Sequence, residues 1–179
     1  MRRMVAAIGS LTQHWEALRE RPQVYRPSAC LGCGLARFWR HGHYTRKADR
    51  QSPSQCRLDP TAILRFCCAG CGQTCSRLPG CLAPRRWYDW AVQQAVLLTL
   101  LVGTSVRRVS AALGPARSTL RRWRAWLERR HEVFSFHLRS RFAEWGRAAD
   151  GPAFWRSALA HTTLAAAMSW LDQHLEVVP

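Results

Sequence analysis

A short internal repeat constrains this chain more than any other feature of its sequence. The repeat reads Cys-x-Gly-Cys-Gly and occurs at residues 30–34 and again at residues 68–72. Two cysteines at this spacing can bring both thiolates to one metal ion at about 2.3 Å, and glycine permits the tight backbone turn between them. The repeat therefore predicts a single zinc ion per chain. Its four expected ligands are Cys30, Cys33, Cys68 and Cys71.

The two halves of this site are far apart in the sequence, because residues 34–67 separate them. This gap is longer than the spacing of about 15 to 20 residues in most zinc ribbons. Doubling a loop costs only about 0.6 kcal/mol, whereas binding of a structural zinc contributes about 10 to 16 kcal/mol. The long gap is therefore compatible with one site. Since four thiolates leave no position for water, we expect the zinc to be structural rather than catalytic.

Four further cysteines do not complete a second site of this kind. They are Cys56, Cys67, Cys75 and Cys81. We interpret them as small buried apolar side chains, which is a common environment for free cysteine. His41 and His43 flank Gly42 in a strand expected over residues 38–45, and either histidine could replace a thiolate. Disulfide pairing is a further alternative, but a reducing compartment favours metal.

The charge of the chain indicates a polyanionic partner. Lysine and arginine together number 27 against 11 acidic residues, and every basic residue except Lys47 is arginine. The guanidinium fork suits phosphate groups and guanine edges, so this bias favours nucleic acid. A GC-rich genome would also enrich arginine, which is the simpler explanation of the composition alone.

Two apolar stretches bear on localisation. Residues 4–8 are too short for a secretory signal, and residues 91–102 are interrupted by Gln93 and Gln94 and fall short of the roughly 20 residues that cross a bilayer. We therefore expect a soluble protein without membrane contact. Its expected location is the cytoplasm, in association with the nucleoid.

The sequence patterns predict an α+β chain, with a small β-rich zinc ribbon followed by an all-α half. Residues 10–21 should form a short amphipathic helix that Ser10 caps and on which Leu11, Trp15 and Leu18 face the core. Residues 47–60 are polar and expected to be a loop. The four expected segments are 1–25 (helical), 26–84 (zinc ribbon), 85–130 (helix-turn-helix) and 131–179 (C-terminal helices for packing or dimerisation).

The third of these segments has the pattern of a helix-turn-helix. A helix over residues 87–102 ends at Gly103, and a second one, capped by Thr104 or Ser105, runs to the turn at Gly114. A third helix starts near residue 117 and has a core stripe of Leu120, Trp123 and Leu127. Its other face is basic, as a recognition helix in the major groove requires. The alternative is a plain helical hairpin with a solvated basic face.

Candidate DNA contacts follow from this arrangement. On the third helix they are Arg117, Ser118, Thr119, Arg121, Arg122 and Arg124. Arg117 and Arg121 are the candidates for reading bases, because residues near the start of this helix reach base edges. Arg107 and Arg108 lie on the second helix, which crosses the backbone, and are expected to contact phosphates.

The C-terminal part gives no sign of catalysis. We expect two helices here. One has the apolar stripe Phe134, Leu138, Phe142 and Trp145, and the other has Trp155, Leu159, Thr162, Ala166 and Trp170. This region has no room for a nuclease domain with three separated carboxylates, and no motif of a hydrolase, nucleotide-binding or metalloprotease site occurs. The expectation is that the protein is not an enzyme.

Several motifs together resemble a known family. They are the two cysteine pairs, the segment Phe38-Trp39-Arg40-His41-Gly42-His43-Tyr44-Thr45-Arg46, the segment from Arg65 to Pro79, and Arg117-Ser118-Thr119-Leu120-Arg121-Arg122-Trp123 after Leu113-Gly114. These resemble a bacterial mobile-element family in which a transposase-like zinc ribbon precedes a helix-turn-helix, similar to regulatory DNA-binding subunits of insertion sequences. The resemblance implies metal ligation by the four cysteines and DNA contact at the start of the third helix. Pro115-Ala116 depart from the family pattern, which has a capping serine there.

Sequence and resemblance together predict a sequence-specific DNA-binding protein of a transposon or its remnant, acting as a regulator or an end-recognition partner. The expected partners are double-stranded DNA, a second copy of the chain and a separate transposase. One alternative is the DNA-binding fragment of a transposase that lacks its catalytic domain. Another is an RNA-binding or protein-adaptor zinc ribbon.

Overall fold

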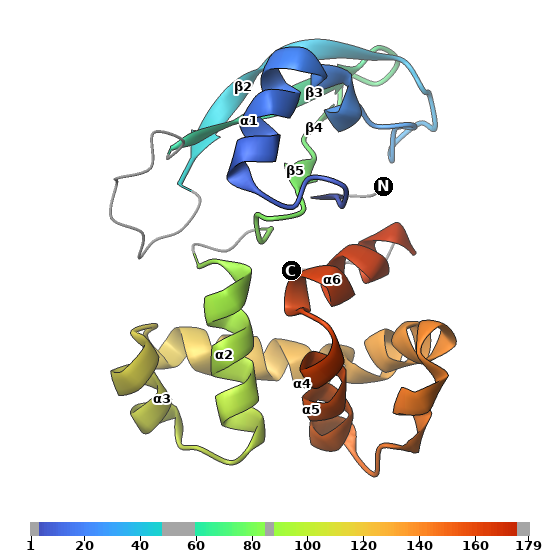
Figure 1. Cartoon of the computed structure of the whole chain (residues 1–179). Coiled ribbons are helices and arrows are strands. Elements are labelled where there is room, and N and C mark those ends of the chain that lie inside the picture. The colour runs from blue at the N-terminus through green and yellow to red at the C-terminus, as the bar shows by residue number, and fades with distance from the viewer. Residues whose placement is uncertain (1–3, 48–59, 85–87, 175–179) are drawn as a thin grey trace. The chain divides into compact units, whose positions relative to one another are not determined.

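The computed structural model describes residues 4–47, 60–84 and 88–174, and the chain divides into two compact units (Figure 1). One unit extends to Asp89 and includes the residues from Asp172 onward, and the other is Trp90–Leu171. The expected mixture of a small sheet and helices is confirmed at this coarse level. Cys56, Trp87 and most of the expected polar loop lie outside the described residues. Among the described helices, none is both long and apolar enough to span a membrane.

The first unit is built on two small sheets. Its elements are β1 (Met4–Val5), α1 (Leu11–Glu20), the 3-10 helix η1 (Pro22–Tyr25), β2 (Phe38–Arg46), β3 (Thr61–Cys68), β4 (Thr74–Cys75) and β5 (Leu78–Pro79). Strands β2, β3 and β4 form an antiparallel sheet in that order, and β1 pairs with β5 in parallel. The expected strand is present, and its register shifts between Arg40 and His43, where Gly42 has a φ of 73°. A glycine in this conformation is typical of a β-bulge.

Helix α1 begins where the sequence predicts, and Leu11 and Leu18 pack against the core as expected, whereas Trp15 does not. The hydroxyl of Ser10 caps it by accepting from the backbone N–H of Gln13 at 3.1 Å. Trp15, expected in the core, is 45% exposed, and the buried residues are His14 and Ala17. His14 can face the core because its ring nitrogens bond to the Tyr25 hydroxyl at 2.5 Å and to the Ala62 carbonyl at 3.0 Å.

The second unit is entirely helical. Its elements are α2 (Trp90–Leu101), α3 (Val106–Leu113), α4 (Arg117–Arg141), the 3-10 helix η2 (Ala143–Arg147), α5 (Gly151–His161) and α6 (Leu164–Gln173), the last of which reaches the unit boundary. Figure 1 shows α4 crossing behind α2 and α5, and α4 packs against α2, α3 and α5. The core of this unit includes Leu120, Trp123, Phe134, Phe154 and Trp155.

The limits predicted for the two C-terminal helices are wrong. Phe134 and Leu138 belong to α4, which continues as one helix to Arg141, whereas Trp145 lies in η2. The helix continues because neither glycine nor proline interrupts residues 117–141. The second expected helix is divided into α5 and α6 because Thr162 is extended, and the hydroxyl of Thr163 accepts from the N–H of Ala166.

Candidate metal centre and nucleic-acid interface

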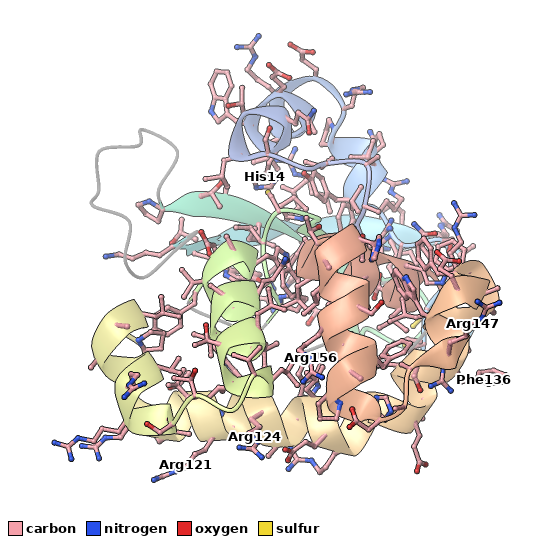
Figure 2. The ribbon with its side chains drawn as sticks, turned by 60° about the horizontal axis from the view of Figure 1, so that its bottom comes forward. His14, Arg121, Arg124, Phe136, Arg147 and Arg156 are labelled. Atoms are coloured by element: carbon pink, nitrogen blue, oxygen red, sulfur yellow. The ribbon has the colours of Figure 1, made fainter. Side chains whose placement is uncertain are left out.

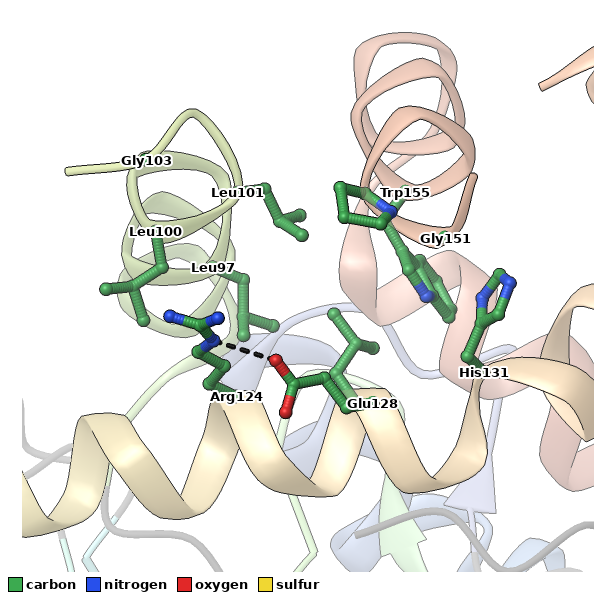
Figure 3. A pocket seen from close by; sticks show the side chains of 11 residues that line it. Leu97, Leu100, Leu101, Gly103, Arg124, Glu128, His131, Gly151 and Trp155 are labelled. Carbon is green, nitrogen blue, oxygen red and sulfur yellow. Dashed lines mark hydrogen bonds and ion pairs between the residues drawn. The ribbon is translucent and has the colours of Figure 1, made fainter. Parts of the chain in front are cut away.

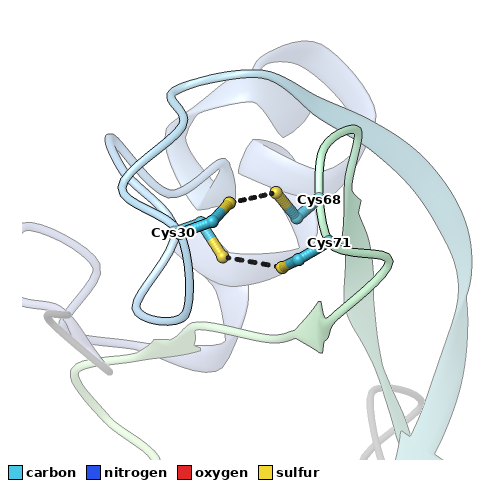
Figure 4. Close-up of side chains that lie close together, drawn as sticks. Cys30, Cys68 and Cys71 are labelled. Atoms are coloured by element: carbon cyan, nitrogen blue, oxygen red, sulfur yellow. Dashed lines mark hydrogen bonds between the residues drawn. The ribbon is translucent and has the colours of Figure 1, made fainter.

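The four cysteines of the repeat come together in the first unit (Figure 4). Their sulfur atoms all lie within 4.8 Å of one another, and the Cys30–Cys71 and Cys33–Cys68 sulfur pairs are each 3.5 Å apart. A tetrahedral ion with bonds of about 2.3 Å to thiolate separates its sulfur ligands by about 3.8 Å. Sulfurs in a disulfide are about 2.05 Å apart. The cluster therefore has the dimensions of a metal cage, and the predicted ligand set could hold an ion.

The two repeats form equivalent backbone turns around this cage. The N–H of Gly34 donates to the Cys30 carbonyl at 2.9 Å, and the N–H of Gly72 donates to the Cys68 carbonyl at 3.1 Å. These two glycines have φ values of 74° and 70°, which L-residues rarely adopt. The N–H of Cys30 and that of Cys68 also bond to the carbonyl five residues onward. The repeated sequence thus encodes a repeated structure.

The other glycine of each repeat gives room to the opposite turn. A Cβ on Gly32 would lie 2.8 Å from Oε1 of Gln73 and 3.6 Å from Sγ of Cys71. On Gly70 it would lie 3.1 Å from Cδ2 of Leu35 and 3.4 Å from the nearest ligand sulfur. Neither space fits a larger residue without movement of a neighbour. A side chain at Gly32 or Gly70 would therefore require the end of the Gln73 or Leu35 side chain to shift.

The ionisation of the four thiols of the cage also favours binding of a cation. The backbone N–H groups of Cys71 and Gly70 lower the pKa of Cys68 to about 6. The N–H of Gln73 lowers the pKa of Cys71, but the neighbouring thiol of Cys30 and the other sulfurs outweigh it and raise this pKa to about 12. Four thiols this close cannot all ionise unless a positive ion balances their charge. The donor set therefore fits a metal ion.

The remaining described cysteines lie outside the cage. Cys75 and Cys81 are partly buried against apolar clusters, and burial raises the pKa of Cys81 to about 11. Cys67 donates its S–H to the Gly72 carbonyl at 3.3 Å. His41 and His43 are exposed on β2. Within the described residues, the four repeat cysteines are the only group found that could hold a metal.

Helices α3 and α4 are joined by the short turn that the sequence indicates. Ser105 caps α3 by accepting from the N–H of Arg108 at 3.4 Å, and Gly114 ends α3 with a φ of 88°. The hydroxyl of Ser110 donates to the Pro115 carbonyl at 2.9 Å and so ties the turn to α3. Helix α4 then begins after Ala116, whose side chain makes no capping hydrogen bond. Three residues connect the two helices, which is compatible with a helix-turn-helix and equally with a plain helical hairpin.

Burial divides α4 into an inner and an outer face. Leu120, Trp123 and Leu127 are buried as predicted. The candidate contact residues lie at the surface: Arg107, Arg108, Arg117, Ser118, Arg121, Arg122 and Arg124 are exposed, and Thr119 is half-buried. Figure 2 shows Arg121 and Arg124 projecting outward from α4. Among the described residues of this face, the only ion pair found joins Arg124 to Glu128 at 2.8 Å.

Comparison with known proteins gives one match. The family model described as Domain of unknown function (DUF6431) matches residues 30–123. The chain belongs to this family. The DUF6431 region begins at the first cysteine of the cage and ends at Trp123, so it contains both repeats, α3 and the first residues of α4. It contains every candidate contact residue except Arg124. No curated protein and no solved structure matches the chain.

Proposed function

We propose that this protein binds double-stranded DNA in a sequence-specific manner through α3 and α4. The observation that supports the proposal best is the exposed arginine face of α4, which lies opposite its buried stripe and follows a three-residue turn. A single α-helix fits the major groove of B-DNA, where arginine can bond to O6 and N7 of guanine. The first turn of α4 carries no acidic residue that would repel phosphate.

Different arginines have different roles in this proposal. Arg117 and Arg121 are four residues apart near the start of α4, so their side chains share one face and meet base edges. Arg107 and Arg108 on α3 contact phosphates and fix the orientation of the protein on the duplex. Ser118, Thr119, Arg122 and Arg124 complete the contact set.

The metal has a structural role in the proposal. We assign zinc to the cage, because zinc favours four thiolates in tetrahedral geometry. Such an ion supplies folding free energy and has no open coordination position. We therefore assign the protein no catalytic activity of its own.

Partners follow from the resemblance and from the surface of α4. The resemblance to insertion-sequence proteins extends the proposal to a regulator or end-recognition partner of a separate transposase at the nucleoid. Phe136 and Val133, which are 72% and 40% exposed on α4, are our candidates for contact with a second copy of the chain. Large exposed apolar residues at helical spacing favour such an interface.

Selection of bound duplexes from a random library, followed by titrations, tests the proposal. Arg117→Ala should cost about 1 to 3 kcal/mol on the selected site and relax its preference at one base pair. Arg107→Ala should weaken the selected site and random duplex equally, and Arg129→Ala is the control for loss of one exposed charge from α4. Equal effects of Arg117→Ala on both duplexes would overturn base reading by α4. Stronger binding to structured RNA than to duplex DNA would favour the RNA-binding alternative.

A further inference from the structure

The helical unit contains a pocket that shares only Arg124 with the proposed DNA-contact set. It lies between α2, α4 and α5 and has a volume of about 410 Å³ (Figure 3). Its walls are mainly apolar and include Leu97, Leu100, Leu101, Leu127 and Trp155. Small-molecule pockets in proteins typically measure about 300 to 1,000 Å³ and have apolar walls with a few polar groups. The size and lining therefore fit a small organic ligand.

Hydrogen bonds between helices hold the walls of this pocket in place. Arg156 on α5 donates to the Leu101 carbonyl at the end of α2, at 2.8 Å. The Gln94 side chain on α2 donates to the Leu159 carbonyl at 3.4 Å and accepts from the Leu164 N–H at 2.7 Å. The distance between α2 and α5 is therefore fixed by polar contacts, and the space between them is part of the fold.

Two ring side chains in the lining, Trp155 and His131, contribute apolar surface to the pocket. Within the described part of the chain, Nε1 of Trp155 and Nδ1 of His131 are buried without a hydrogen-bond partner. Figure 3 shows both side chains on one side of the pocket, opposite Leu97 and Leu101. Gly151 lies against the imidazole, since a Cβ there would be 3.3 Å from the ring of His131. Both nitrogens are shielded from solvent, so they do not face the open pocket, and a ligand there meets the carbon atoms of these two rings.

The charged groups of the pocket, Arg124 and Glu128, are both on α4. Arg124 lines the pocket and bonds through Nε to Glu128, which leaves its terminal nitrogens with further donors. A guanidinium can hold two acceptors at once because its five N–H groups form a fixed fork. An anionic ligand group could therefore join this pair without displacing Glu128.

We propose that this pocket binds a small aromatic anion. The aromatic ring lies among the leucines of α2 and beside the ring of Trp155, and the negative group lies at Arg124. This assignment does not depend on DNA binding, because all groups that it uses belong to the pocket. If the proposed function also holds, an occupied pocket would engage Arg124, one of the DNA-contact candidates, and so link ligand to DNA affinity.

Binding of 8-anilinonaphthalene-1-sulfonate to the zinc-loaded full chain tests the site by fluorescence titration. Leu101→Trp fills the pocket and should weaken binding at least tenfold. Val102→Trp is the matched control, because Val102 is the next residue, is 65% exposed and does not line the pocket. It should stay within twofold of the unmodified chain, and circular dichroism checks that both variants are folded. Equal affinities of the two variants, or no saturable binding at one probe per chain, would overturn the site.

A second experiment tests whether the ligand must carry a negative charge. N-phenyl-1-naphthylamine has the same rings without the sulfonate, so the unmodified chain should bind it several-fold more weakly than the sulfonate. Arg124→Gln should remove this preference, whereas Arg129→Gln on the exposed face of α4 should keep it. An unchanged preference in Arg124→Gln would overturn the assignment of an anion. Since neither titration contains DNA, these results are independent of whether the proposed function is correct.

Discussion

Replacement of Gly72 by alanine should weaken metal binding by an amount that follows from the backbone alone. Gly72 closes the second cysteine turn with a φ of 70°, and its N–H donates to the carbonyl of Cys68. A Cβ built there meets nothing within 4 Å. The alanine side chain therefore causes no steric collision. The free-energy cost of the substitution is that of placing an L-residue in the left-handed region, about 1 to 2 kcal/mol.

This cost should appear directly in the metal affinity. Because a structural metal folds its own site, the free energy lost in the turn is lost from binding. About 1 to 2 kcal/mol corresponds to a roughly 5- to 30-fold weaker apparent zinc affinity. Gly34→Ala should give the same loss, since Gly34 has a φ of 74° and open space around it. Gly72→Asn should cost less, because asparagine tolerates this conformation better than alanine does.

The assay is competition for zinc between the protein and a chromophoric chelator at constant pH. Circular dichroism of each metal-loaded variant checks that the fold is retained. An alanine variant at Gly72 with unchanged zinc affinity would refute the argument, because the turn would then not need a positive φ. A loss at Gly34 that differs greatly from the loss at Gly72 would show that the two turns are not energetically equivalent.

Three further predictions concern the ligands, a buried histidine and self-association. Cys68→Ser should abolish stoichiometric zinc in elemental analysis, whereas Cys67→Ser, one residue earlier, should retain it; equal retention would contradict the ligand assignment. Burial lowers the pKa of His14 below its usual 6.5, so the unfolded chain binds a proton at this ring more readily than the folded chain does. The free energy of unfolding therefore decreases as the pH falls below 6.5. Urea unfolding at pH 5.5 and 7.5 should therefore show a smaller pH dependence in His14→Gln than in the unmodified chain, and equal dependences would contradict this reasoning. Phe136→Ser should shift a dimer toward monomer in analytical ultracentrifugation, whereas an unchanged distribution would exclude Phe136 from the interface.

The parts of the fold that the sequence predicts well are those set by local chemistry. The cysteine repeat, the caps at Ser10 and Ser105 and the glycine turn at Gly114 each depend on a few neighbouring residues. On α1 the prediction was wrong at one position, since Trp15 is exposed and the polar His14 is buried instead. His14 is buried only because Tyr25 and Ala62, 11 and 48 residues away, satisfy its ring.

The helix limits in the C-terminal half illustrate a second reason why parts of the fold could not be predicted from the sequence. The apolar stripe from Trp155 to Trp170 has helical spacing throughout, yet the backbone is extended at Thr162. Periodicity reports which side faces the core, and two successive helices on one core produce nearly the same pattern. The pocket between α2, α4 and α5 had no signal in the sequence, because its walls come from three helices whose packing is set by the fold.

Because α4 is one continuous helix, truncation or recombination within it would disrupt the helical unit. Its 25 residues extend for about 37 Å at 1.5 Å per residue. The first turns carry Arg117 and Arg121, and the later turns carry Phe134 and Leu138 into the core with α5 and η2. A truncation or gene fusion after residue 130 would cut this helix and remove Phe134 and Leu138 from that core. The segment from α3 to the start of α4 is therefore not a portable module, and recombination that transfers it intact must also transfer the helices that follow.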